Sequence, residues 1–183
     1  MRIIIIFTVI LSLLFISCNK QSNQINYSNN NTVSNAISIK ADTMLVKSLT
    51  NKQYGKDKYT ILKLYDLDSN GYYTARRLEL IKNSKLISSI PIPSPEDVKN
   101  FEILKIEETN QGFFISIFWG GGNNMYNHIY YFVFIDEQFY LNKIEKEHQF
   151  KASNNDFDEE SKTIDVKNKI SFSEFRIIDY LDY

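Results

Sequence analysis

From about residue 36 onward, short runs of apolar and β-branched side chains alternate with polar turn signals, a pattern that predicts β-strands. The clearest runs span residues 59–65, 72–81 and 86–92. Asn70 and Gly71 follow the first run, and both residue types tolerate a positive φ, which makes this pair the strongest hairpin signal in the chain. Asn83 and Ser84 supply the next turn. The three runs therefore predict an antiparallel meander, preceded by two weaker strand-like runs at 36–40 and 43–47.

A second meander is predicted after a proline-rich interruption. Pro91, Pro93 and Pro95 end strand pairing because proline cannot donate a ladder hydrogen bond. Residues 94–97 read as the start of one or two helical turns, with serine as the cap and proline at the first helical position. The strand-like runs that follow span residues 101–107, 113–119, 128–135 and 139–147.

The last part of the chain is less regular. Residues 151–162 are polar and acidic and predict a mobile excursion. In the tail, Ile177, Ile178 and Leu181 are spaced like one face of a short helix, while a closing strand over 170–175 fits equally well. No internal repeat is present. We expect a mainly β fold in which antiparallel meanders form a sandwich or a curled sheet, with minor helix.

The link between the runs 113–119 and 128–135 stands out by composition. Three successive glycines lie between Trp119 and Tyr126, and glycine allows a positive φ or a close approach to the backbone. The flanking aromatic residues offer flat faces with a polar handle, which suits a sugar or a partner loop. A floppy loop or a bulged corner is the alternative. The candidate binding loop comprises Trp119, Gly120, Gly121, Gly122, Asn123, Asn124 and Tyr126.

The N-terminus carries an export signal. Arg2 is followed by an apolar run over residues 3–16 and then by Ser17 and Cys18, the single cysteine of the chain. A charged start, a short apolar run and a small residue at the cut describe a secretory signal, and the run is shorter than the roughly 20 residues that a membrane-spanning helix needs. The alternative is an ordinary secretory signal with a cysteine placed there by chance.

A cysteine at this position resembles the lipobox of bacterial lipoproteins, although Phe15 stands where leucine is usual. The resemblance covers residues 1–18. It implies that Cys18 receives a diacylglyceryl group, that residues 1–17 are removed, and that the protein is held at a membrane of the bacterial cell envelope. Two or more acyl chains anchor a protein stably, because each buried methylene contributes about 0.8 kcal/mol.

Composition then divides the mature chain into a tether and a folded body. Residues 19–35 hold seven asparagines and few core-forming side chains, so we expect residues 18–35 to form a flexible tether. As a random coil, the 17 residues 19–35 span roughly 20–25 Å. Residues 36–183 are expected to form a single β-rich domain, which must be stabilised by core burial because no second cysteine is present for a disulfide.

Charge gives no reason to expect a nucleic-acid partner. Without Arg2, 20 of the 21 basic residues remain against 22 acidic ones, which is a net charge of −2. Nucleic-acid binding proteins generally carry a clearly basic face. The expected partners are therefore the membrane, reached through the lipid anchor, and a protein or a glycan of the envelope.

The segment Asp66, Asp68, Asn70 and Gly71 matches the first half of a calcium loop. Position twelve of such a loop should be a glutamate but is Arg77, and the flanks are strands rather than helices. The segment therefore fails as an EF-hand. Two alternatives remain, a plain hairpin turn or a calcium-bound turn of other geometry, and we expect no metal site.

Signals for catalysis are sparse, and we expect neither a cofactor nor an enzyme. His128 and His148 lie on different predicted strands without the spacing of a zinc pair, and His128 reads as a satisfied, partly buried residue. Residues 156–160 gather carboxylates in a polar run, which indicates a solvated loop rather than a tuned acid–base pair. The leading hypothesis is an envelope binding module, in a narrower version an inhibitor or immunity-type protein. The alternative is an envelope hydrolase with a dispersed site.

Overall fold

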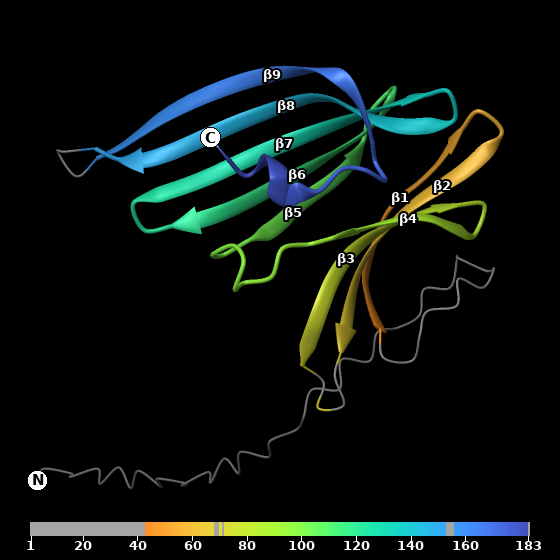
Figure 1. Cartoon of the computed structure of the whole chain (residues 1–183), viewed down its shortest axis with the longest axis horizontal. Helices are drawn as coiled ribbons and strands as arrows, with labels where there is room; N and C mark the ends of the chain where they lie inside the picture. The colour runs from red at the N-terminus through yellow and green to blue at the C-terminus, as the bar shows by residue number, and fades with distance from the viewer. Residues whose placement is uncertain (1–42, 68–69, 71, 153–155, 183) are drawn as a thin grey trace, which may run out of the picture. The chain divides into compact units, whose positions relative to one another are not determined.

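A computed structural model describes residues 43–67, 70, 72–152 and 156–182, although not the side chains of 43–51 and 73–75. Cys18, the signal segment, the tether and the predicted strand 36–40 lie outside the described residues. Within the described ranges, nine strands make up two antiparallel sheets (Figure 1). Among the described residues, none of the helical structure has the length and apolar character needed to cross a membrane.

The first sheet has four strands in sequence order: β1 (Thr43–Tyr54), β2 (Asp57–Leu67), β3 (Tyr73–Lys82) and β4 (Lys85–Pro91). The meander predicted from residue 59 to residue 92 is confirmed as β2, β3 and β4, and the weaker run 43–47 is the start of β1. Asn83 and Ser84 both take a positive φ, of 47° and 67°, in the tight turn between β3 and β4. This turn chemistry is why the sequence located the hairpin correctly.

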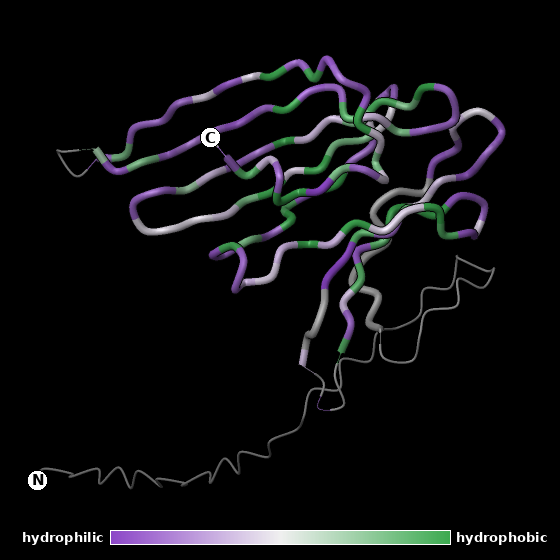
Figure 2. Tube along the Cα trace, in the orientation of Figure 1, coloured by the Kyte–Doolittle hydropathy of each residue, from purple (hydrophilic) through white to green (hydrophobic). Residues whose placement is uncertain are grey.

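The second sheet has five strands, again in sequence order: β5 (Glu102–Glu108), β6 (Gly112–Gly121), β7 (Asn124–Ile135), β8 (Gln138–Lys151) and β9 (Phe157–Ser171). The first four match the predicted runs. β9 corrects the prediction of a mobile excursion over 151–162, because residues 157–162 begin a 15-residue strand paired with β8. As an edge strand, β9 pairs on one side only and keeps most side chains in solvent, so it reads as polar (Figure 2).

Helix is limited to the 3-10 helix η1 (Ile177–Tyr180) within the described residues. Of the two alternatives for the tail, the strand ends at Ser171 and a single helical turn follows. Residues 94–97 form a turn rather than a helix: the amides of Asp97 and Val98 both donate to the carbonyl oxygen of Ser94. The predicted fold class, mainly β with a sandwich-like pairing of antiparallel sheets, is confirmed.

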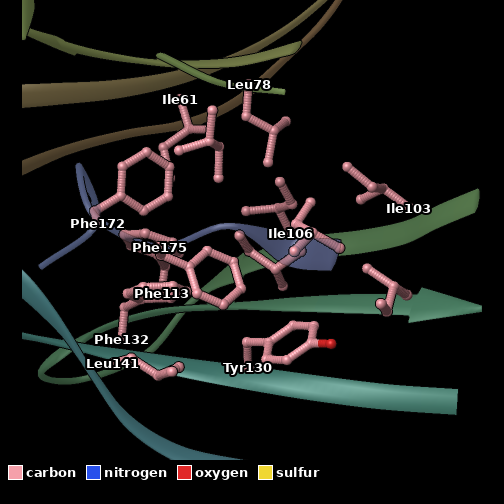
Figure 3. Packing of buried hydrophobic residues seen from close by; sticks show 14 of the residues in the cluster. Ile61, Leu78, Ile103, Ile106, Phe113, Tyr130, Phe132, Leu141, Phe172 and Phe175 are labelled. Atoms are coloured by element: carbon pink, nitrogen blue, oxygen red, sulfur yellow. The ribbon is translucent and has the colours of Figure 1, made fainter. Parts of the chain in front are cut away.

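One hydrophobic core joins the two sheets. Ile61 and Leu78 of the first sheet belong to the same buried cluster as Phe113 and Phe132 of the second. The tail completes this cluster, because the ring of Phe172 lies 5.7 Å from that of Phe113 and 5.4 Å from that of Phe132 (Figure 3). Aromatic pairs at these distances add edge-to-face attraction to the burial of area.

Strand alternation gives the five-stranded sheet two different faces. Even-numbered residues of β7, such as Tyr130 and Phe132, point toward the core, and we call this the inner face. Odd-numbered residues, such as Met125, Ile129 and Tyr131, lie on the outer face, are half-buried and are not part of the core cluster.

Candidate functional site

The predicted binding loop is a tight hairpin rather than an eight-residue link. β6 runs to Gly121 and β7 begins at Asn124, so only Gly122 and Asn123 lie in the turn. Gly120 and Gly121 pair with Met125 and Asn124 across the strands. The three glycines have φ values of 100°, 130° and 69°, which side chains rarely adopt. The glycine run thus lets the strands continue to the turn, which composition alone did not reveal.

Trp119 and Tyr126, the aromatic ends of the candidate loop, are paired opposite each other on the inner face. Their rings stack with centroids 5.0 Å apart and planes 13° apart, and the ring of Tyr126 stacks in turn on His148 at 4.4 Å and 8°. The residue Trp119 is only 7% exposed. The flat faces expected for a ligand are therefore used inside the fold, in a ladder that crosses β6, β7 and β8.

His148 is held between two oxygen acceptors. Its Nδ1 lies 3.0 Å from Glu160 Oε1, and its Nε2 lies 2.9 Å from Asn124 Oδ1. These contacts tie the ladder to β9 on one side and to the hairpin on the other. They also place one of the predicted carboxylates, Glu160, against a histidine, while Asp158 and Glu159 are exposed on β9.

His128 is more deeply buried than the sequence predicted. It is 0% exposed, its ring meets that of Trp119 edge to face at 4.3 Å, and its Nδ1 lies 3.3 Å from the hydroxyl oxygen of Tyr130. Its Nε2 makes no hydrogen bond of ordinary geometry among the described residues, so the histidine is satisfied at Nδ1 only and is fully rather than partly buried. Burial, together with the nearby Lys146, lowers the pKa of His128 to about 3, which keeps the imidazole neutral at physiological pH.

Lys146 was missed by sequence reasoning. It lies directly opposite His128 on the inner face of β8, and its side chain is 3% exposed. Its Nζ donates to the carboxylate of Asp182 at 2.9 Å and also to the backbone carbonyl oxygen of Asp182. This ammonium lowers the pKa of the Asp182 carboxyl. The available signal was a lysine two residues from Ile144, in the inward register of a strand.

A groove of about 400 Å³ opens beside this ion pair. Its walls are β8, β9 and the C-terminal segment, which crosses the inner face of the sheet (Figure 1). Four aliphatic residues line it, Ile144, Ile164, Val166 and Ile170, together with Lys167, Asn168, Tyr180 and the acidic residues Asp165 and Asp179. Lys146 and Asp182 also line it, so the groove has a mixed lining in which aliphatic side chains adjoin a buried cation.

The outer face carries an apolar patch, which we call the outer patch. It consists of half-buried side chains from the two central strands: Phe114 and Phe118 of β6, with Met125, Ile129 and Tyr131 of β7. Lys143 lies over the Tyr131 ring at 4.0 Å, and the Tyr131 hydroxyl donates to Glu145 at 2.7 Å. These two contacts fix the orientation of the Tyr131 ring within the patch.

Acidic residues surround the outer patch. In the four cross-strand rows that hold it, carboxylates outnumber lysines: Glu102, Glu107, Glu145, Glu147, Glu159 and Asp165 stand against Lys105 and Lys143. Both lysines already pair with carboxylates, Lys105 with Glu107 at 2.9 Å and Lys143 with Glu145 at 2.6 Å. The rim of the patch is therefore net negative.

The segment tested for calcium is built around an ion pair. Arg77, at position twelve of the sequence match, binds the Asp66 carboxylate and also bonds Glu79 at 2.7 Å. Asp68 lies outside the described residues. Within the described ranges, no group of three or more His, Cys, Asp and Glu side chains is arranged to hold a metal ion. The Asp66 carboxylate is therefore engaged in an ion pair between β2 and β3.

In comparisons with known proteins, no family model matches the chain, and no curated protein or solved structure matches it.

Proposed function

We propose that this chain is a lipid-anchored protein of the bacterial envelope that binds a protein partner through its outer patch. The observation that carries the proposal is the outer patch itself, an aromatic and methionine-containing centre on a sheet face outside the core, enclosed by a net-negative rim. Aromatic residues and methionine are enriched at the centres of protein interfaces, while charged residues are depleted there and belong to the rim.

The partner is defined by complementarity. A surface that covers Phe118, Met125 and Ile129 must itself be apolar, and the surrounding carboxylates favour lysine or arginine around that surface. We therefore propose a partner protein with an apolar patch and a basic rim. A narrower version is an inhibitor or immunity-type protein, whose partner is then a cationic enzyme or toxin.

Two observations favour a protein partner over a glycan and binding over catalysis. The ring faces of Trp119 and Tyr126, which suited a sugar, are stacked on each other and on His148. His128 is neutral and enclosed, and His148 faces Asn124 and Glu160 rather than a nucleophile. An envelope hydrolase with a dispersed site is the alternative class, and it predicts a turnover that survives loss of the outer patch.

The proposed attachment to the membrane depends on Cys18. A diacylglyceryl group on this residue, followed by the Asn-rich tether, holds the body within a few nanometres of the bilayer. Such a protein meets its partner at the membrane surface.

The test uses the full chain, immobilised, and an envelope extract. Proteins retained by the wild type are identified by mass spectrometry, and the affinity of each purified candidate is then measured for Phe118→Ala/Met125→Ala. The matched control is Leu86→Ala, an exposed apolar truncation on β4 of the other sheet. We expect the double variant to weaken binding by about tenfold or more, the control to leave it unchanged, and added salt to slow association.

Equal affinity of the double variant and the wild type for every retained protein would overturn the outer patch as the binding surface. Thermal midpoints of all variants are measured first, because only a folded double variant reports on the interface.

A further inference from the structure

The groove between β8, β9 and the C-terminal segment lies on the opposite face of the sheet from the outer patch and is independent of the partner proposed above. We propose that this groove binds an aliphatic carboxylate, with the ligand carboxylate on Lys146 in place of Asp182 and the ligand chain along the four aliphatic side chains of the lining.

The carboxylate end is defined by Lys146. An ammonium that is 3% exposed is stable only when an anion or several acceptors compensate its lost hydration. At present the compensating anion is the Asp182 carboxylate, so the site already accepts a group of this chemistry. Asp165, Asp179 and Lys167 also line the groove, so the ligand carboxylate is held by its direct contact with Lys146 and not by the net charge of the groove.

The body of the ligand is defined by the lining. Ile144 and Ile164 lie directly opposite each other on β8 and β9, and Val166 and Ile170 extend the aliphatic part of the lining along β9. A volume of about 400 Å³ lies within the range of small-molecule sites. A straight alkyl chain that ends in one carboxylate matches this arrangement.

Asp182 is suited to being displaced. Its side chain is 81% exposed, so leaving Lys146 returns it to water at little cost. It competes all the same, because a carboxylate on the same chain acts at a high effective concentration. Removing its charge must therefore strengthen binding of a free carboxylate.

The experiment is isothermal titration of the purified full chain at pH 7 with octanoate, and with octanol as the ligand of similar length that lacks the carboxylate. The variants are Asp182→Asn, Lys146→Met and Lys146→Gln. The matched control is Lys143→Met, which removes a lysine from the outer face of the same strand. Thermal midpoints confirm that each variant is folded.

We expect octanoate to bind Asp182→Asn about tenfold or more tightly than the wild type. We expect both Lys146 variants to lose the binding, Lys143→Met to keep it, and octanol to bind far more weakly than octanoate. Octanoate binding that is unchanged in the Lys146 variants, no tighter in Asp182→Asn, or matched by octanol would overturn the proposal. If both Lys146 variants unfold, the octanoate affinity of Asp182→Asn relative to that of the wild type still tests the proposal.

Discussion

The indole of Trp119 and the phenol of Tyr126 face each other across β6 and β7, with ring centroids 5.0 Å apart and planes 13° apart. The ring of His128 meets that of Trp119 edge to face, and the ring of His148 stacks on that of Tyr126. The four rings therefore form one aromatic cluster on the inner face. The two aromatic ends of the β6–β7 hairpin are thus packed into the inner face, while Gly122, Asn123 and Asn124 at its tip are exposed. Substitutions in the packed part of this hairpin are therefore expected to change the stability of the fold.

Trp119→Ala should therefore destabilise the fold. Removing a buried tryptophan leaves a cavity and typically costs about 3–5 kcal/mol. We expect the free energy of unfolding in urea to fall by about that amount, whereas Phe157→Ala, which truncates an exposed aromatic residue on β9, should change it by less than about 1 kcal/mol. A Trp119→Ala protein as stable as the wild type would show that the indole is not part of the core.

The glycines of the hairpin should differ sharply in tolerance. A Cβ on Gly120 would lie 2.5 Å from the Asn124 carbonyl oxygen at a φ of 100°, so Gly120→Ala should cost about 1–3 kcal/mol or more. Gly122 has open space around it and a φ of 69°, near the left-handed region that asparagine tolerates. Gly122→Asn should therefore be nearly neutral in thermal denaturation. Equal losses at both positions would contradict the close approach at Gly120.

The fold was predictable where local chemistry decided it. Turn residues such as Asn83 and Ser84 set the hairpins, and runs that are apolar on both faces, such as 113–119, marked the central strands. β9 escaped prediction because edge strands need no apolar pattern: its 15 residues are ordered by pairing with β8. Pairing between segments is a property of the fold and not of one segment.

The inner-face site escaped prediction for a related reason. Lys146 and Asp182 are 36 residues apart, and no spacing rule connects them. The stack of Trp119, Tyr126 and His148 depends on register, which places the three side chains in one cross-strand row. In the sequence the same aromatic residues looked like the exposed ends of a glycine-rich loop. The register of β6, β7 and β8 decides between these interpretations.

Lipidation should depend on the single cysteine. Cells expressing the wild-type chain and grown with a clickable fatty acid should yield a labelled product, because the cysteine thiol is the group that accepts the diacylglyceryl chain in bacterial lipoproteins. Cys18→Ser should yield an unlabelled product with a retained or differently cleaved signal, checked by mass spectrometry. Equal labelling of the two proteins, or none in either, would remove the anchor from the proposed function.

His128 should make stability depend on pH well above the range of the carboxylates. Its pKa is about 3 in the folded protein and about 6.5 in the unfolded chain, so between these values the unfolded state binds the extra proton. Protons therefore favour unfolding, and stability falls as pH is lowered through 6.5 toward 3. From pH 7 to pH 5 the contribution of this one group is about 2 kcal/mol.

The measurement is urea unfolding of the wild type and of His128→Phe at several values between pH 7 and pH 5. Phenylalanine keeps an aromatic ring against Trp119 but cannot be protonated, so the variant should lose less stability over this range by about 2 kcal/mol. The other titrating groups are the same in the two proteins, and Asp182, whose pKa is lowered by Lys146, stays ionised over this range, so their contributions cancel in the difference. If the two stability curves were parallel, His128 would bind protons equally in the folded and unfolded states. Water would then reach its imidazole, and the site beside Lys146 would not be enclosed.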